Sequence, residues 1–439
     1  MGQCKRVLAG VFATTAILSL AGCMDGAGGE GGGIVSRFAS SDPSGEEARA
    51  KESAESRIIS TLQARRSILP GESAFSKVSV SVLAANARTA EAELRSARLR
   101  AKAMSTNWLP TIGPNISLSS LGAVIASLVI DQVLFDNGRK KAERDFAKAD
   151  VEVAAVSLSV DTNARLHTAL GLYVTAQEAR EKAGLGSRAL KDMQKFEWIM
   201  SERVKGGVSD MSDLNVIRHK LAEMQSSRSR EVEAANAAIA ELNAMSVTPL
   251  GDLGGLSELR LSVDDATPLA VLMAEAEMER SVAKAKIDRA GFLPGLSAKG
   301  TVSSTGGSDV GLSLSTDTML GLGTGANLRA IEIEKEAASR RVAQAREDAN
   351  RVLRSEEQRV VALTRQVAES GGLTRQAKAN LDLFQAQYEA GQRQVMDVVG
   401  VYETFARQEQ SQVALKYDMA RAQIKIANEL GLLADGGDI

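Results

Sequence analysis

The sequence Ala90-Glu91-Ala92-Glu93 occurs again as Ala274-Glu275-Ala276-Glu277, 184 residues further along a chain of 439 residues. At the same offset, ten of the 31 positions in 90–120 are identical to their counterparts in 274–304. The offset also connects later residues in pairs: Leu109-Pro110 with Leu293-Pro294, Gly207 with Gly391, and Asp213 with Asp397. An offset that stays constant over this length indicates two copies of one large structural unit rather than a short motif.

In each copy the pattern changes from helical to strand-like at a Leu-Pro pair, because proline cannot extend a helix. In the first copy, residues 115–119 alternate between polar and apolar. Val124 to Phe135 is then an apolar run that ends in the turn sequence Asp136-Asn137-Gly138. These patterns predict a β-hairpin over 115–135, with short strands, and a second hairpin over 296–315 in the second copy.

Long helices are predicted after each hairpin. Between Arg139 and about Ser201 the chain has no proline, and a helix of about 63 residues would be about 95 Å long. A helix of that length indicates a coiled coil or a helical tube. The helices expected around it are a helical stretch from 42 to 108 with one break at Pro70-Gly71, a return helix over 209–245, and their second-copy equivalents over 268–290, 326–390 and 395–433.

The predicted organisation follows the two copies. It comprises a signal peptide (1–22), a lipidated cysteine with a flexible glycine-rich tether (23–45), the first repeat (46–245), a linker (246–267), the second repeat (268–433) and a C-terminal tail (434–439). The expected fold is mainly α with a small β part. Its duplicated unit consists of a helix, a β-hairpin, a very long helix and a return helix.

The N-terminus has the features of a processing signal: basic Lys5 and Arg6, an apolar run, and then Leu20-Ala21-Gly22-Cys23. The last four residues resemble the lipobox of bacterial lipoproteins, which implies that Cys23 is acylated. Met24 follows the cysteine, and the absence of an aspartate at that position favours the outer membrane by the rule for such lipoproteins. The alternative is an ordinary secretory signal in which Cys23 has no special role.

Composition excludes several classes of protein. Removal of residues 1–22 takes away Lys5 and Arg6 and no acid, which changes the formal charge from −2 to −4 and argues against a nucleic-acid surface. Cys4 also lies in that segment, so Cys23 would be the only remaining cysteine and no disulfide could form. The chain has 3% aromatic and 25% charged residues, a composition that suits long helices.

No catalytic or metal-binding pattern is visible, and we expect neither an enzyme nor a cofactor. His167 and His219 are the only histidines and lack metal-ligand spacing. Gly321-Leu322-Gly323-Thr324-Gly325 has the glycines of a phosphate-binding loop but not its lysine, so a strand-to-helix joint is favoured.

The number of predicted strands bears on oligomerisation. A protein inserted in the outer membrane without a spanning helix needs a closed β-barrel, and single-chain barrels have at least eight strands. Four predicted strands can close a barrel only if several protomers contribute, provided that the hairpins insert.

Five short stretches resemble the TolC-like outer-membrane factor family over residues 46–433. They are Trp108-Leu109-Pro110, Phe292-Leu293-Pro294, the strand-to-helix sequence from Gln132 to Arg139, Tyr388-Glu389-Ala390-Gly391, and Asp397-Val398. The second copy departs from this pattern, because residues 319–323 stand where the first copy has its Phe135 signature. We therefore expect an irregular end to that strand.

The resemblance implies a homotrimer with a 12-stranded outer-membrane β-barrel that continues into a periplasmic α-helical barrel. Such proteins are passive exit ducts of tripartite efflux or type I secretion systems. The implied partners are outer-membrane lipid, a periplasmic adaptor protein, and an inner-membrane pump that is either proton-driven or of the ABC type.

The resemblance also assigns roles to residues near the two glycine turns. Asp397 would line the periplasmic aperture, while a second aperture acid of the family falls on Gly400. A latch would join the two helical hairpins through Tyr388, Arg393, Ser212 and Asp213. The adaptor would contact the tips at Gly206, Gly207, Val208, Gly391 and Gln392. For Asp397, the alternative is a carboxylate that only stabilises the start of its helix.

The competing hypothesis is a lipid-anchored periplasmic coiled-coil scaffold without a channel. The alternation of Ile116 and Leu118, and of Leu312 and Leu314, speaks against it, because a soluble scaffold gains nothing from apolar strand faces.

Overall fold

A computed structural model describes residues 56–85, 89–118, 124–259, 266–304, 306–319 and 321–438. The predicted signal peptide, Cys23 and the glycine-rich tether lie outside these residues.

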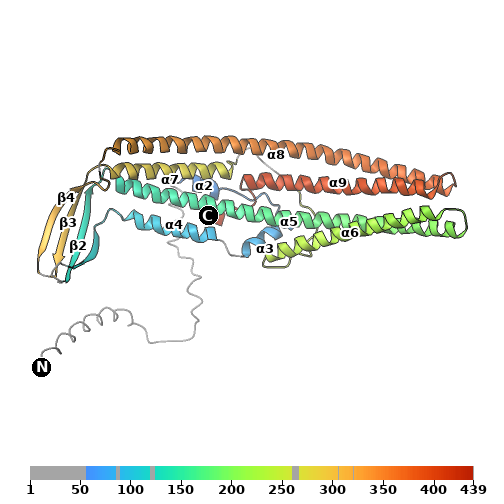
Figure 1. Cartoon of the computed structure of the whole chain (residues 1–439), viewed down its shortest axis with the longest axis horizontal. Helices are drawn as coiled ribbons and strands as arrows, with labels where there is room; N and C mark the ends of the chain where they lie inside the picture. The colour runs from blue at the N-terminus through green and yellow to red at the C-terminus, as the bar shows by residue number, and fades with distance from the viewer. Residues whose placement is uncertain are drawn as a thin grey trace, which may run out of the picture. The chain divides into compact units, whose positions relative to one another are not determined.

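Two long helices organise the described part of the chain (Figure 1). Helix α5 (Arg139–Lys205) turns back into α6 (Met211–Ala244), and α8 (Thr324–Glu389) turns back into α9 (Val395–Glu429). Shorter helices precede each hairpin of strands. They are α2 (Arg57–Gln63), α3 (Ala74–Ala84) and α4 (Thr89–Ser105) in the first half, and α7 (Leu269–Gly291) in the second. The chain ends in a 3-10 turn, η2 (Gly436–Asp438).

The duplication predicted from the sequence is confirmed by the element boundaries. Strands β1 (Thr111–Leu118) and β3 (Gly295–Ser303) begin 184 residues apart. The ends of α5 and α8 have the same separation, at Lys205 and Glu389, and so have the starts of α6 and α9, at Met211 and Val395. The two copies therefore align without an insertion from the first strand to the start of the return helix.

One prediction for the first copy is wrong in detail, because the helical stretch from 74 to 107 forms two helices. Ala85 leaves the helical region, with φ −74° and ψ 77°. The Arg165 guanidinium on α5 donates hydrogen bonds to the carbonyl oxygens of Val82 and Ala85 at the end of α3. These carbonyls thus have a partner from α5 instead of the next helical turn, which accounts for the end of α3.

The strands form one antiparallel sheet in the order β1-β2-β3-β4, completed by β2 (Val124–Phe135) and β4 (Ser308–Ser315). β1 starts four residues earlier than predicted and contains Pro114, which is compatible with an edge strand. β2 has 12 residues, so the expectation of short strands in the first hairpin is wrong for β2. β4 ends at Ser315, before Met319, the counterpart of Phe135.

The two faces of the sheet differ in polarity. On one face the large apolar side chains are exposed by fractions from 39% for Ile130 to 82% for Val310. Register places them opposite one another or in neighbouring pairs: Ile112, Ile116, Leu128, Ile130, Val302, Val310, Leu312 and Leu314. The other face is mostly polar, with Lys299 and Asp131 paired at 3.5 Å, although it also holds Ile125 and Val129.

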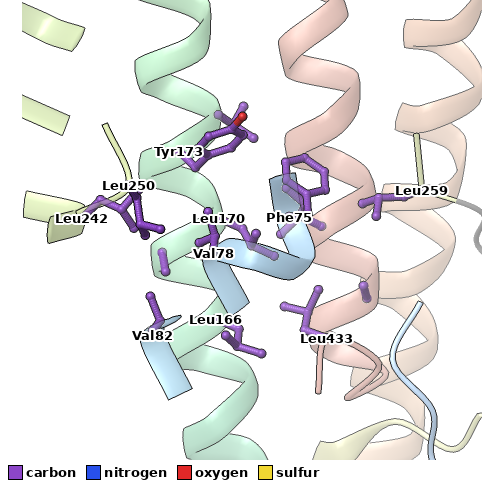
Figure 2. Packing of buried hydrophobic residues seen from close by; sticks show 14 of the residues in the cluster. Phe75, Val78, Val82, Leu166, Leu170, Tyr173, Leu242, Leu250, Leu259 and Leu433 are labelled. Carbon is purple, nitrogen blue, oxygen red and sulfur yellow. The ribbon is translucent and has the colours of Figure 1, made fainter. Parts of the chain in front are cut away.

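The main apolar core lies around the middle of α5, where α3, α6 and the end of the chain meet it. Figure 2 shows Phe75 and Tyr173 among its members. Their rings are 5.9 Å apart in an edge-to-face arrangement. The segment between α6 and α7, predicted as a linker, adds Leu250 and Leu259 to this core. Its carbonyl groups accept hydrogen bonds from α5, including one from the Tyr173 hydroxyl to Gly255 at 2.8 Å.

A buried arginine holds the end of α9 to the start of α7. Arg65 donates hydrogen bonds to the carbonyl oxygens of Leu430 at 2.8 Å and Thr267 at 2.6 Å. Burial lowers the pKa of Arg65 to about 10, so the guanidinium remains charged at neutral pH. The contact joins the first repeat to both ends of the helical part of the second repeat.

None of the helices in the described ranges combines the length and the apolar character that crossing a bilayer requires.

Substitution of Phe75 by alanine should destabilise the protein by about 3–5 kcal/mol, because it leaves a cavity beside Tyr173 in the main core. The measurement is unfolding by denaturant, followed by circular dichroism at a helical wavelength. Val80→Ala is the matched control, since Val80 lies on the same helix but is exposed. Equal losses for the two variants would contradict the position of this core.

Candidate functional site

The two helical hairpins end in turns of the same geometry. Gly207 and Gly391 have φ values of 69° and 72°, in the left-handed region that favours glycine. In both turns the amide two residues beyond the helix cap donates to a carbonyl five residues back. These bonds are Val208 N to Arg203 O and Gln392 N to Gln387 O, each 2.8 Å long. This arrangement is a Schellman motif, which closes a helix with backbone bonds alone.

The tips are exposed in the protomer. All five residues predicted to contact an adaptor, Gly206, Gly207, Val208, Gly391 and Gln392, are exposed. Val208 is apolar and 67% exposed. The predicted tips are therefore accessible, while their contact with an adaptor stays a prediction.

Side chains fix the start of each return helix. Asp210 caps α6 and accepts a hydrogen bond from the Ser212 amide at 3.3 Å. In α9, Gln394 and Asp397 form a capping box, in which the Gln394 amide donates to Asp397 Oδ2 at 3.2 Å. Asp397 is exposed and stabilises its own helix start, as the alternative interpretation requires. A position of Asp397 in an aperture depends on neighbouring protomers and stays a prediction. The same holds for the missing second aperture acid of the family, whose place is taken here by the exposed Gly400.

The four predicted latch residues are not joined to one another in the described part of the protomer. Arg393 Nε donates to Gln387 Oε1 at 2.9 Å, and its guanidinium lies 4.3 Å from the centre of the Phe384 ring. Tyr388 packs against the apolar cluster at the tips. Ser212 is exposed and Asp213 lies in the first turn of α6, where a carboxylate favours the helix dipole. Their latch role stays a prediction.

Two other contacts do join the hairpins near the tips, and sequence reasoning missed both. The Tyr402 hydroxyl on α9 donates to Asp192 Oδ2 on α5 at 3.0 Å. Lys220 Nζ on α6 lies 2.5 Å from both carboxylate oxygens of Glu403 on α9. We call these two contacts the tip ties.

The ring of Tyr402 is buried, and it meets Phe196 edge to face with the ring centres 5.9 Å apart. Burial, followed by the adjacent Asp192 carboxylate, raises the pKa of Tyr402. The phenol therefore stays protonated at physiological pH and can only donate to Asp192.

A second pair of contacts joins α9 to α5 further from the tips. The Tyr417 hydroxyl donates to Glu181 Oε2 at 2.7 Å, and Lys416 Nζ lies 3.0 Å from the same oxygen. Tyr417 follows Tyr402 by 15 residues, which is about 22 Å along a helix. Tyr402 and Tyr417 thus make the same type of bond at two levels of one helix pair.

An apolar cluster lies between the hairpins at the level of the tip ties. Its buried members come from all four long helices: Ala189, Met193, Phe196, Met200, Leu214, Ile217, Leu381, Val395, Val398, Val399, Tyr402 and Ala406. We call it the tip cluster. A sequence pattern could have located the Tyr402 tie. The apolar positions at the start of α9 repeat at helical spacing: Val395, Val398, Val399 and Tyr402. A buried tyrosine usually needs a partner for its hydroxyl.

Metal binding has no support among the described residues, which include no cluster of three or more His, Cys, Asp and Glu side chains suited to an ion. His219 is exposed beside Glu223 at 3.2 Å, and burial lowers the pKa of His167.

Comparison with known proteins identifies the fold of the chain and a family match for its second repeat. Residues 267–432, which include the second hairpin of strands and the helices α7, α8 and α9, match the family model "Outer membrane efflux protein". No curated protein sequence matches the chain.

Solved structures of low sequence identity share the fold over most of their length. A membrane protein from Pseudomonas aeruginosa is 17% identical, with 84% of this chain and 92% of that chain covered and a TM-score of 0.72. The Campylobacter jejuni CmeC outer membrane channel is 13% identical, with coverages of 83% and 86% and a TM-score of 0.68. The Vibrio cholerae outer membrane protein VceC is 14% identical, with coverages of 83% and 96% and a TM-score of 0.67.

Residues 267–432 thus resemble the outer membrane efflux protein family, and the solved structures that share the fold of the chain include an outer membrane channel. The predicted resemblance to TolC-like proteins is confirmed, as is the mainly helical fold with a duplicated unit.

Proposed function

We propose that three copies of this chain form the exit duct of a tripartite efflux or type I secretion system in the bacterial outer membrane. The observation that carries this proposal is the sheet, which exposes one apolar face and whose strands β2 and β4 lead into the N-termini of α5 and α8. An exposed apolar patch of this extent marks an interaction site, and a bilayer is the partner that fits a β-sheet with unlike faces.

The number of copies follows from closure of the sheets into a barrel. Among the described strands, β1 and β4 each have one neighbour in the sheet. Their free edges carry backbone groups that hydrocarbon cannot hydrogen-bond. Pairing of β4 with β1 of the next copy satisfies both edges, and three copies give the twelve strands that the TolC-like resemblance implies. Continuation of α5, α6, α8 and α9 around the same axis gives the periplasmic helical barrel.

The anchor and the partners are further parts of the proposal. Acylation of Cys23 would add a lipid anchor to the inserted sheet, and two membrane signals together suffice for stable attachment. The tips at Gly207 and Gly391 would contact a periplasmic adaptor, which couples the duct to a proton-driven or ABC pump in the inner membrane. Energy for transport comes from the pump, because the duct is passive.

Substitution of Cys23 by serine should abolish metabolic labelling with radioactive palmitate, since the thiol is the acceptor of the acyl chain. The sheet is a separate anchor, so the variant should still fractionate with membranes after a salt wash. Cys4→Ser is the control and should leave the labelling unchanged. Labelling that persists in the Cys23 variant would contradict lipidation at this residue.

Closure of the duct at the tips is the second element of the mechanism. The tip ties hold α9 to α5 and α6 in the protomer, while Tyr388, Arg393, Ser212 and Asp213 would act where neighbouring protomers meet. Hydrogen bonds and ion pairs of this partly exposed kind contribute about 1 kcal/mol each. Such contacts keep a duct shut at rest and yield to the binding energy of an adaptor.

The double variant Tyr402→Phe with Glu403→Gln should increase the open fraction of single channels in planar bilayers about five- to thirtyfold, which corresponds to a loss of about 1–2 kcal/mol. Phenylalanine keeps the ring in the tip cluster and removes only the hydroxyl. Asp192 keeps access to water after the change, since its side chain is 40% exposed.

Tyr417→Phe is the matched control for this experiment. It removes an equivalent hydroxyl-to-carboxylate bond between α9 and α5, but far from the tips. It should leave the open fraction unchanged. If Tyr388→Phe with Arg393→Ser opens the channel and the tip-tie variant does not, closure depends on contacts between protomers. Trimers without any conductance would instead favour the scaffold hypothesis and contradict the duct itself.

Substitution of Asp397 by alanine should reduce cation selectivity and block by divalent cations, because three carboxylates at one narrow level attract cations. Asp397→Asn is the second variant, since an amide can retain a helix-capping bond while it loses the charge. Reversal potentials in a salt gradient measure the effect. Unchanged cation selectivity with Asp397→Asn would show that Asp397 acts only as a stabiliser of the start of α9.

A further inference from the structure

The connection between β4 and α8 exposes two large apolar side chains. Met319 is 93% exposed and Leu322 is 110% exposed, the two highest values for large apolar residues in the described part of the chain. Exposure of this degree costs free energy in water, so two such residues, four and seven positions beyond the end of β4, suggest a contact.

The connection is held at both ends by its own hydrogen bonds and ion pair. The Asp317 carboxylate pairs with Arg139 at the start of α5. The Thr318 amide donates to the carbonyl oxygen of Gly291 at the end of α7, at 2.9 Å. On the other side, the Gly321 amide donates to Thr324 Oγ1 at 2.9 Å. These contacts hold the backbone on both sides of Met319 and Leu322 while the two side chains project outwards.

The two residues belong to a group of exposed apolar side chains where strands join helices. The group also contains Trp108 and Leu109 before β1, Leu293 before β3, and Phe135 at the end of β2. Met319 is the counterpart of Phe135 at the repeat offset of 184. In β4, the exposed Leu312 and Leu314 lead directly into the connection, so the apolar face of the sheet continues into it.

We propose that Met319 and Leu322 insert into the boundary between headgroups and acyl chains of the phospholipid leaflet that faces the helices. The inference rests on the proposed insertion of the sheet in the membrane. Membrane barrels carry a girdle of aromatic side chains at each interface, and Trp108 and Phe135 supply such side chains on the first repeat. On the second repeat, Met319 and Leu322 take that place, and the ion pair of Asp317 with Arg139 neutralises the nearby carboxylate at the boundary.

The test uses tryptophan fluorescence in the full-length protein reconstituted in phosphatidylcholine vesicles. The background variant is Trp108→Phe with Trp198→Phe, which removes both native tryptophans. A single tryptophan is then introduced as Leu322→Trp or, separately, Met319→Trp. Vesicles contain lipids brominated either near the headgroup or near the chain ends. Both tryptophans should lose more fluorescence to the shallow bromines than to the deep ones.

Two controls separate this inference from the proposed function. Leu312→Trp, in the middle of the apolar sheet face, should be quenched most by the deep bromines if the sheet inserts. Native Trp198, which is exposed on α5, should be unquenched in the Trp108→Phe variant.

Quenching of Leu312→Trp without quenching of Leu322→Trp and Met319→Trp would overturn the inference and leave membrane insertion intact. In that case a blue-shifted tryptophan emission from Leu322→Trp and Met319→Trp would indicate that a second copy of the chain buries these positions. Absence of quenching at all three positions would overturn both the inference and the proposed insertion.

Discussion

The unsatisfied edges of a four-stranded sheet are the constraint on which the proposed assembly depends. Each backbone amide and carbonyl buried away from water needs a hydrogen-bond partner. A single copy leaves one side of β1 and one side of β4 without a strand neighbour among the described residues. The exposed apolar face makes these unpaired edges more costly, because the hydrocarbon that would cover such a face cannot hydrogen-bond with the edge amides and carbonyls. Both edge strands have eight residues, so their lengths match for pairing.

The long helices face a different requirement, since charged helices of this type gain most of their stability from packing. α5 packs against α6, α7 and α9, and it contributes to the main core around Tyr173 as well as to the tip cluster. The segment between the repeats has no helix or strand in its described part, but its carbonyls accept hydrogen bonds from Tyr173 and Gln177. The two repeats are thus joined by packing along α5 and not only by the chain.

Features that depend on local sequence could be predicted, and features that depend on distant partners could not. The turns at Gly207 and Gly391 could be predicted because a tight turn of this kind requires a positive φ, which excludes most residues other than glycine. The hairpin of strands at 296–315 followed from alternation and turn residues. The break after Ala84 was missed because it depends on Arg165, about 80 residues away. The tie between Asp192 and Tyr402 spans 210 residues, and each residue alone has an ordinary place in a helical pattern.

The arrangement at the tips limits how the proposed duct would open. Separation of the two hairpins within a protomer would expose the tip cluster, which contains Met193, Ile217 and Val398. Burial of each such side chain stabilises by about 1.5–3 kcal/mol, so the cluster holds the hairpins more strongly than the tip ties do. A sliding or twisting motion of α8 and α9 across α5 and α6 keeps apolar surfaces in contact. Polar contacts such as Lys220 with Glu403 depend on a single geometry and break in such a motion. In the proposed duct, opening by sliding would therefore have an energetic cost set by the polar ties, while the apolar cluster would keep the tips folded throughout.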